Sequence, residues 1–310
     1  MEHGPARIVP LAVWWGAMQI DLQVYLLEGE ELGLVDTAGP GASLVEALAA
    51  DGRAPAEISV VINIHAHADH AGGNHTVKTL GGGRLCIHRD DAPFLEDPGL
   101  SFDRFFGPRT RILRGEAAAT AERAAYIEGM GGALAADRLL DDGDLIELGG
   151  SLAIRVIHLP GHTPGSAGFF WEKEGILIAG DSVAGLGTPE GSLPLVFDLA
   201  AYRASVDRLL DMPIGRLYTS HPYRGLRVTA AAVREGADVR TYLEDSKEMA
   251  ARLAEAFEAQ ADRADDAPLI EIADAVVDSL PPEMGHRRIA ELPFADFTAT
   301  MVLWGTRGAQ

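Results

Sequence analysis

The sequence predicts an α/β fold, in which short buried strands alternate with helices. Residues 58–62 (ISVVI) form a β-branched run between turn-forming residues, which is typical of a buried strand. Residues 42–51 instead carry Leu44, Val45 and Leu48 at helical spacing. The chain has 310 residues, of which 47% are hydrophobic. This is enough for one large α/β domain, or for one domain with a smaller appendage.

Two strands are expected before this helix, at residues 22–28 and 32–37, because a polar turn at residues 29–31 separates two apolar runs. The later part of the chain repeats the strand pattern at residues 84–88, 144–148, 152–158, 169–171 and 176–179. Helices are predicted over the alanine-rich residues 117–130 and over residues 199–211, whose apolar side chains recur at helical spacing.

A histidine-rich loop follows the strand at residues 58–62. It holds four potential metal ligands within six residues: His65, His67, Asp69 and His70. Loops at the carboxyl ends of buried strands are where open α/β sheets carry their chemistry. Neutral imidazole suits zinc, and a carboxylate can share the same ion or a second one. The alternative is a histidine-rich surface loop, but we favour a metal site because three histidines and an aspartate rarely share this spacing by accident.

Three later positions repeat this arrangement, each just past a predicted strand. His162 lies in the segment PGHTPGS at residues 160–166, Asp181 follows Gly180, and His221 ends an apolar run. In this order the four motifs resemble the signature of the metallo-β-lactamase fold superfamily. The resemblance covers about residues 22–222.

The resemblance implies a four-layer αββα sandwich whose strand ends hold two divalent metal ions. It assigns His65, His67 and His162 to the first ion, and Asp69, His70 and His221 to the second. Asp181 is assigned to both ions. Zinc is the expected metal, with manganese or iron as alternatives. Two such ions can share a hydroxide that attacks a carbonyl, while Asp69 passes its proton to the leaving group.

Three positions bear on which branch of the superfamily the chain resembles. Residues 185–188 (GLGT) stand where glyoxalase II-like thioesterases usually show a G-C-G-R-like stretch, and Ala184 stands where acyl-homoserine lactonases commonly have tyrosine. Asp181 occupies the position at which β-lactamases proper usually carry cysteine. We therefore expect hydrolysis of a small-molecule ester, thioester or lactone. The alternatives are a mononuclear iron persulfide dioxygenase and a phosphodiesterase acting on RNA.

The composition argues against nucleic acid and membranes as partners. The chain has 46 acidic and 26 basic residues, a net charge of −20, whereas phosphate-backbone binding needs clustered Lys and Arg. No apolar run reaches the roughly 18 residues needed to cross a membrane. Residues 8–18 contain Pro10 and are not expected to be a signal peptide. Cys86 is the only cysteine, so we expect no intrachain disulfide and a cytoplasmic protein.

Residues 97–140 fit the resemblance least. Phe102, Phe105 and Phe106 precede three arginines between residues 109 and 114 in an otherwise acidic chain. One interpretation is a lid or pocket wall that holds an anionic or amphipathic substrate, since long loops are often functional. The other, which we favour, is a surface excursion whose aromatic side chains pack on the domain and whose arginines pair with local acids.

The chain is predicted to divide into a catalytic domain, residues 1–224, and a helical C-terminal extension, residues 225–310. Within the extension, apolar residues recur at helical spacing between residues 239 and 257. A second helix is expected over residues 269–280, which two prolines follow. We interpret the extension as an all-helical cap over the site or as the face of a homodimer.

Four further residues are candidates for supporting roles. Asp36 ends the second strand of the opening hairpin, and we favour support of the metal site over capping of the next turn. Asp90 and Asp91 are expected to supply favourable charge at a helix start. Tyr223 lies two residues after the last histidine of the signature and is a candidate donor to an oxyanion.

Overall fold

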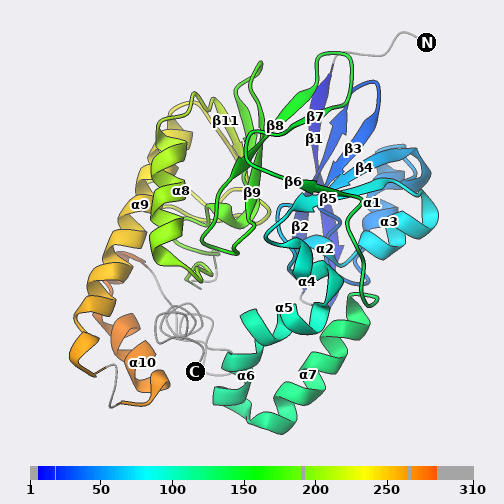
Figure 1. The fold of residues 1–310 in the computed structure, drawn as a ribbon. Helices are drawn as coiled ribbons and strands as arrows, with labels where there is room; N and C mark the ends of the chain where they lie inside the picture. The colour runs from blue at the N-terminus through cyan, green and yellow to red at the C-terminus, as the bar shows by residue number, and fades with distance from the viewer. Residues whose placement is uncertain (1–5, 18, 190–192, 264–266, 285–310) are drawn as a thin grey trace.

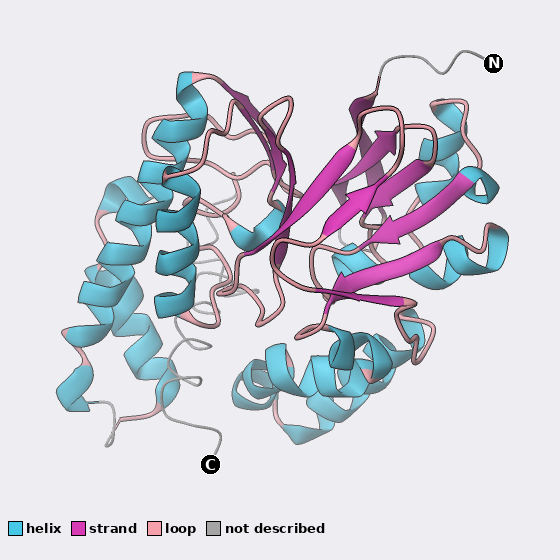
Figure 2. Cartoon of the chain, turned by 45° about the horizontal axis from the view of Figure 1, so that its top comes forward, coloured by secondary structure: helices cyan, strands magenta, loops and turns pink. Residues whose placement is uncertain are grey.

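The computed structural model describes residues 6–17, 19–189, 193–263 and 267–284 of the chain. Two six-stranded sheets face each other, and helices cover the outer face of each sheet (Figures 1 and 2). The predicted α/β class and the four-layer αββα arrangement are confirmed.

The first sheet comes from the N-terminal half of the chain. In sheet order its strands are β1 (Arg7–Trp15), β2 (Ile20–Glu28), β3 (Leu32–Val35), β4 (Ile58–Ile62), β5 (Arg84–His88) and β6 (Arg138–Leu140). Strands β1 to β3 are antiparallel, whereas β3 to β6 are parallel. The predicted hairpin is confirmed, because Glu28 pairs with Leu32 across the turn. Strand β1 is an addition to the predicted elements.

The second sheet follows in the chain and is largely antiparallel. In sheet order its strands are β12 (Val233–Glu235), β11 (Arg216–Tyr218), β10 (Ile176–Ile178), β9 (Ala167–Trp171), β8 (Ala153–His158) and β7 (Leu145–Glu147). Among these described strands, only β10 and β11 pair in parallel. The strand order places β10 and β11, whose ends carry two of the candidate ligands, side by side.

Alternation along the strands explains the layers. In β2, Tyr25 and Leu27 pack between the sheets, whereas Val24 and Leu26 face the helices. Neighbouring side chains of the second sheet also divide in this way, with alternate residues in the core between the sheets and in the core beneath the outer helices. Because successive side chains of a strand point to opposite faces, one apolar strand contributes to two cores at once.

Helices form the two outer layers. On the first sheet these are α1 (Leu44–Ala50), α2 (Ala68–Ala71) and α3 (Asn74–Leu80), and on the second α8 (Leu199–Leu210) and α9 (Ala237–Glu258). Within the described residues, none of the helices combines the length and the apolar character that crossing a membrane requires.

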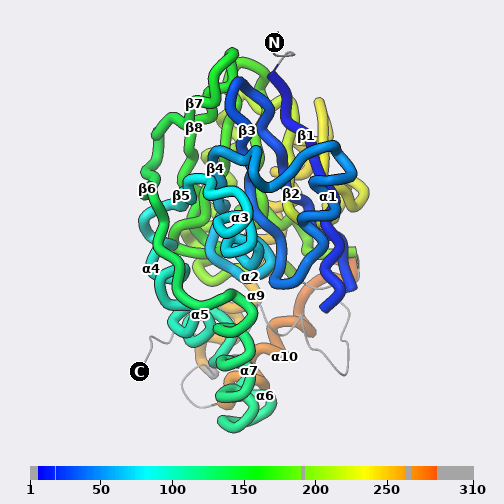
Figure 3. The backbone as a smooth tube through the Cα atoms, turned by 90° about the vertical axis from the view of Figure 1, so that its right-hand side faces the viewer, coloured from blue at the N-terminus to red at the C-terminus, as the bar shows by residue number. Residues whose placement is uncertain are grey.

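An insert of helices separates β5 from β6. It comprises α4 (Ala92–Glu96), α5 (Pro98–Phe105), α6 (Gly107–Arg114) and α7 (Glu116–Gly129), which lie together at one end of the molecule (Figures 1 and 3). The expected pairing with local acids is present for two of its arginines: Arg111 contacts Asp103 and Glu116, and Arg114 contacts Glu122.

The C-terminal segment is not all helical, which corrects the prediction. Strand β12 pairs with β11 and completes the second sheet. Helix α9 then packs on α8 and on the outer face of that sheet, and α10 (Leu269–Ser279) packs on α9. Residues 285–310 of the predicted extension lie outside the described residues. The division at residue 224 stays a prediction, although elements on both sides of it belong to one layer.

Candidate metal centre

All seven predicted ligands lie together at the ends of strands from both sheets. The loop after β4 and helix α2 supply four of them, and the loops after β8, β10 and β11 supply one each: His65, His67, Asp69 and His70; then His162, Asp181 and His221. Each half of the chain therefore contributes one sheet and part of the site. Their binding of metal ions stays a prediction.

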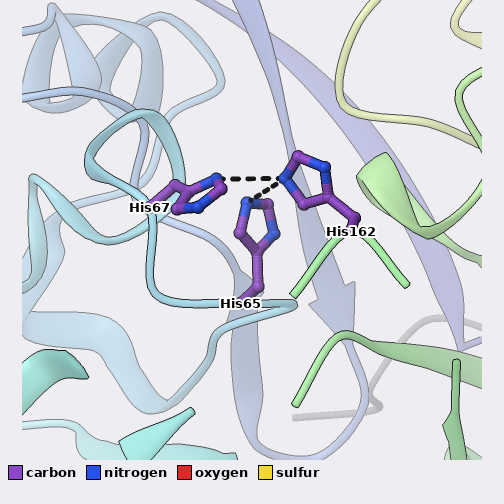
Figure 4. Close-up of side chains that lie close together, drawn as sticks. All are labelled: His65, His67 and His162. Atoms are coloured by element: carbon purple, nitrogen blue, oxygen red, sulfur yellow. Dashed lines mark hydrogen bonds between the residues drawn. The ribbon is translucent and has the colours of Figure 1, made fainter. Parts of the chain in front are cut away.

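Three imidazoles form the first cluster (Figure 4). The Nε2 atom of His162 lies 3.1 Å from Nε2 of His65 and 3.0 Å from Nδ1 of His67. One ring nitrogen donates at most one hydrogen, so N–H···N hydrogen bonds cannot satisfy all three nitrogens together. A single cation among them would accept all three lone pairs.

Asp69, His70, Asp181 and His221 form the second cluster. Nε2 of His221 lies 3.2 Å from Oδ2 of Asp69 and 3.5 Å from Oδ2 of Asp181. Nε2 of His70 lies 3.4 Å from the same Asp181 oxygen, which is also 4.0 Å from Nε2 of His162 in the first cluster. Asp181 thus lies between the two clusters.

Two ligand atoms show that these residues fit divalent metal ions. Nε2 of His70 and Oδ1 of Asp181 are buried and have no hydrogen-bond partner. Leaving a buried polar atom unpaired costs about 1–3 kcal/mol, so such atoms in a native fold usually serve an ion or a water. Imidazole nitrogens and carboxylate oxygens are donors that zinc, manganese and iron accept.

Burial controls protonation in the first cluster. It lowers the pKa of His65 and His67 well below the usual 6.5, and neighbouring imidazoles strengthen this shift. Burial also lowers the pKa of His162. All three rings are therefore neutral at pH 7, which is the state that binds metal.

The second cluster is electrostatically different. Burial disfavours the charged forms, but the carboxylates around His70 and His221 raise the pKa of both rings. In turn, these imidazoles hold the pKa of Asp69 and Asp181 below the usual range despite the same burial. A metal cation bound there would take the place of the imidazole protons as the partner of the two carboxylates.

Residues 23–221 match the family model described as the Metallo-beta-lactamase superfamily. The chain belongs to this superfamily. A solved metallo-beta-lactamase family protein of Thermus thermophilus superposes with a TM-score of 0.61 and 24% sequence identity. The superposition covers 98% of this chain and 94% of that protein, and it shows that the fold is shared.

Two curated relatives align over part of their length. The hydroxyacylglutathione hydrolase of Maricaulis maris is 28% identical over 170 residues, which is 54% of this chain and 49% of the relative. The atrochrysone carboxyl ACP thioesterase of Pseudocercospora fijiensis is 27% identical over 157 residues, 51% of this chain and 43% of the relative. The chain thus spans about half the length of these curated relatives.

Asp36 supports the site, as expected from the opening hairpin of the superfamily. Its Oδ2 lies 2.7 Å from Nδ1 of His70, and its Oδ1 accepts a hydrogen bond from the N–H of Ile64 at 2.9 Å. Asp36 is buried and has φ of 61°, in the left-handed region that few residues adopt. The contact fixes the His70 ring with its other nitrogen toward the carboxylates of the second cluster.

Asp91 joins the two loops that carry the first cluster. Its buried carboxylate accepts hydrogen bonds from the N–H of Ala66 at 2.9 Å, the hydroxyl of Thr163 at 2.9 Å and the N–H of Gly165 at 2.7 Å. Asp91 is the N-cap residue of α4, at a helix start as expected, but its side chain makes no capping hydrogen bond to that helix. Burial raises the pKa of Asp91 to about 6, although these hydrogen bonds oppose the shift.

A third group, His88, Asp90 and His158, has ligand atoms within 4.8 Å of one another. Its two rings are stacked, with 4.0 Å between centroids and 10° between planes. Because imidazole lone pairs lie in the ring plane, parallel stacked rings do not point at a common ion. His158 instead contacts the carbonyl oxygen of Pro164 at 2.8 Å and steadies the loop that carries His162.

Aromatic side chains of the insert lie against the first cluster. The ring of Phe105, which has no exposed surface, lies 4.7 Å from that of His67, and Phe106 lies 5.1 Å from it. Packing of the aromatic residues on the domain was expected, but the favoured interpretation, a surface excursion, did not place them beside a ligand. The alternative, a lid or pocket wall, stays a prediction.

Proposed function

We propose that this protein hydrolyses a small ester, thioester or lactone at a centre of two divalent metal ions, with zinc as the expected metal. The observation that carries the proposal is the position of Asp181 between two clusters of buried ligands. Seven donors exceed the four that a closed structural zinc site uses, so a catalytic centre with open positions is the better interpretation.

The donors would divide between the ions as the two clusters do. The first ion would be held by His65, His67 and His162, the second by Asp69, His70 and His221, with Asp181 shared. When bound, such a pair of ions lowers the pKa of a coordinated water towards 7 and polarises a carbonyl. The first site offers neutral rings, whereas the second offers carboxylates, so the two occupied sites would differ in net charge although both ions are divalent.

Asp69 is the residue proposed to move the proton. Its side chain is 25% exposed against 6% for Asp181, so it is the carboxylate that an incoming substrate reaches. The 3.2 Å contact with His221 fixes one of its oxygens. Its lowered pKa keeps it ionised, so it can accept a hydrogen bond from the attacking water. It would take the proton of that water as the water adds to the carbonyl, and pass it to the departing oxygen or sulfur.

The relatives favour acyl substrates. One is named a hydrolase of hydroxyacylglutathione and another an ACP thioesterase. The paired arginines of the insert do not favour the phosphodiesterase alternative, because Arg111 and Arg114 contact acidic side chains that already match their charge.

The test is a substrate screen on protein freed of metal and reloaded with zinc, manganese or iron. Aryl esters, lactones and acyl thioesters would be offered to each form. We expect hydrolysis of at least one class that depends on added metal. Failure of all three classes, together with oxygen uptake on a thiol persulfide by the iron form, would replace hydrolysis with the dioxygenase alternative.

A further inference from the structure

Four aromatic side chains beside the first cluster form what we call the aromatic wall: Phe105, Phe106, Tyr126 and Phe197. The insert supplies the first three, and the segment before α8 supplies the fourth. The ring of Phe197 lies 4.9 Å from Phe105, and that of Tyr126 lies 5.6 Å from Phe106. Segments far apart in the chain therefore build one continuous surface.

The wall touches a candidate metal ligand directly. The rings of Phe105, Phe106 and Phe197 lie 4.7, 5.1 and 6.0 Å from the ring of His67. The outer nitrogen of that histidine, Nε2, is buried and has no hydrogen-bond partner. The surroundings of the first cluster on this side are therefore apolar, whereas the second cluster has carboxylates.

Three residues of the wall are partly exposed. Phe106, Tyr126 and Phe197 are only partly buried, unlike Phe105. The hydroxyl of Tyr126 lies 3.1 Å from that of Ser101 on α5.

Three arginines of the insert are paired with acids. Arg111 and Arg123 both contact Asp103, and Arg114 contacts Glu122. The chain as a whole carries a net charge of −20. A carboxylate placed against the aromatic rings would lose water, which is unfavourable, whereas an uncharged apolar group gains by burial.

We propose that the aromatic wall binds an uncharged, apolar acyl group of the substrate beside the first cluster. The inference rests on the hydrolase function proposed above and narrows it to neutral aryl or medium-chain acyl esters and thioesters. In the reaction, water adds to the acyl carbon, the C–O or C–S bond breaks, and the leaving oxygen or sulfur takes the proton.

The test compares thioesters of one small, neutral thiol, N-acetylcysteamine, that carry acetyl, butyryl, hexanoyl or succinyl groups. Release of the thiol by the zinc-loaded protein gives kcat/KM for each. We expect at least about a tenfold rise from acetyl to hexanoyl, since each added methylene in an apolar site favours binding, and poor turnover of succinyl. A flat profile, or a preference for succinyl, would overturn this inference.

Two variants test whether the aromatic wall causes the preference for longer acyl groups. Phe106→Leu should lower kcat/KM for hexanoyl more than for acetyl and so remove most of the gain, because the longer chain buries more of its surface against the wall. The matched control is Phe94→Leu, whose ring packs on Phe105 at 4.8 Å within the core of the first sheet and should keep the wild-type profile. Equal losses on all acyl groups in Phe106→Leu would overturn the assignment. If that variant does not fold, the wild-type profile decides.

Different results would contradict the proposed hydrolase function and the acyl-binding role of the aromatic wall. If metal-loaded protein turns over none of the thioesters, nor any ester or lactone, the proposed function is wrong and this inference falls with it. If it turns them over without regard to chain length or charge, the hydrolase function stands and the acyl-binding role of the wall is wrong.

Discussion

His67 has two chemically different sides. Its Nδ1 faces His162 at 3.0 Å, while its Nε2 is buried, without a hydrogen-bond partner, against the aromatic wall. A metal-binding histidine usually donates its second N–H to a carboxylate or carbonyl, which fixes the ring. His162 follows that pattern through the carbonyl oxygen of Leu195, whereas His67 is held by ring packing.

Replacing His67 by alanine is expected to remove most activity and to reduce bound metal, while the fold persists. The change deletes one of three donors of the first cluster. Changes to residues that hydrogen-bond to a metal ligand typically cost about 10–100-fold in activity. The loss in kcat/KM of His67→Ala should therefore be larger than that. Metal analysis and circular dichroism would accompany the kinetics. His75→Ala is the matched control, because His75 lies outside both clusters. Full activity in His67→Ala would refute the site assignment.

Asp91→Asn is expected to weaken metal binding about 10–100-fold and to leave the overall fold intact. The amide keeps the size of the side chain but replaces one acceptor oxygen with an NH₂ donor. This NH₂ group would face other donors, either the N–H of Gly165 or the groups that donate to the second carboxylate oxygen. Asp90→Asn is the control, because that neighbouring side chain is half exposed. Zinc competition with a chromogenic chelator measures the effect, and equal affinities in the two variants would contradict the role of Asp91.

The candidate ligands could be predicted from the sequence, whereas the role of Asp91 could not. Four ligands were predictable because they crowd into one short loop, and the other three because each follows an apolar strand. Asp91 gave no such signal, since its partners lie 25, 72 and 74 residues away and it sits beside a second aspartate at a helix start. From the sequence alone, a buried aspartate that accepts hydrogen bonds cannot be distinguished from a charged surface residue.

At the scale of elements, the central strands, the long helices and the edge strand β7 could be predicted, but the other outermost strands, β1, β6 and β12, could not. Strand β1 is a nearly continuous apolar run that contains Pro10, a residue that argues against a strand. It is tolerated because β1 is at the edge of its sheet, where proline is found. Strand β12, with three residues and one buried side chain, is too short to show alternation.

A chain truncated after residue 224 is expected to be unfolded or insoluble, because β12 and α9 complete the second sheet and its helical layer. The loss would expose the core formed by Leu177, Leu209 and Leu217, against which Tyr242 and Leu243 pack. Circular dichroism and thermal unfolding of the truncated chain against the full chain measure this. A cooperative unfolding transition close to that of the full chain would instead support a separable extension.

At the scale of the whole molecule, the site depends on closing the sandwich. One sheet carries four candidate ligands and the other three, so neither half of the chain has a complete centre. The α/β class followed from local strand and helix patterns, and the four-layer arrangement followed from the resemblance to the superfamily. The contact between the insert and His67 did not, because packing between distant segments leaves no periodic trace in the sequence.

The central claim is that the seven side chains hold two metal ions that act together in hydrolysis. The most direct measurement is a zinc titration of metal-free protein, followed at each step by bound metal per chain and by the rate of thioester hydrolysis. We expect two ions per chain, with full activity only when both are bound. Saturation at one ion per chain, or one iron ion with oxygen uptake in place of hydrolysis, would contradict the claim.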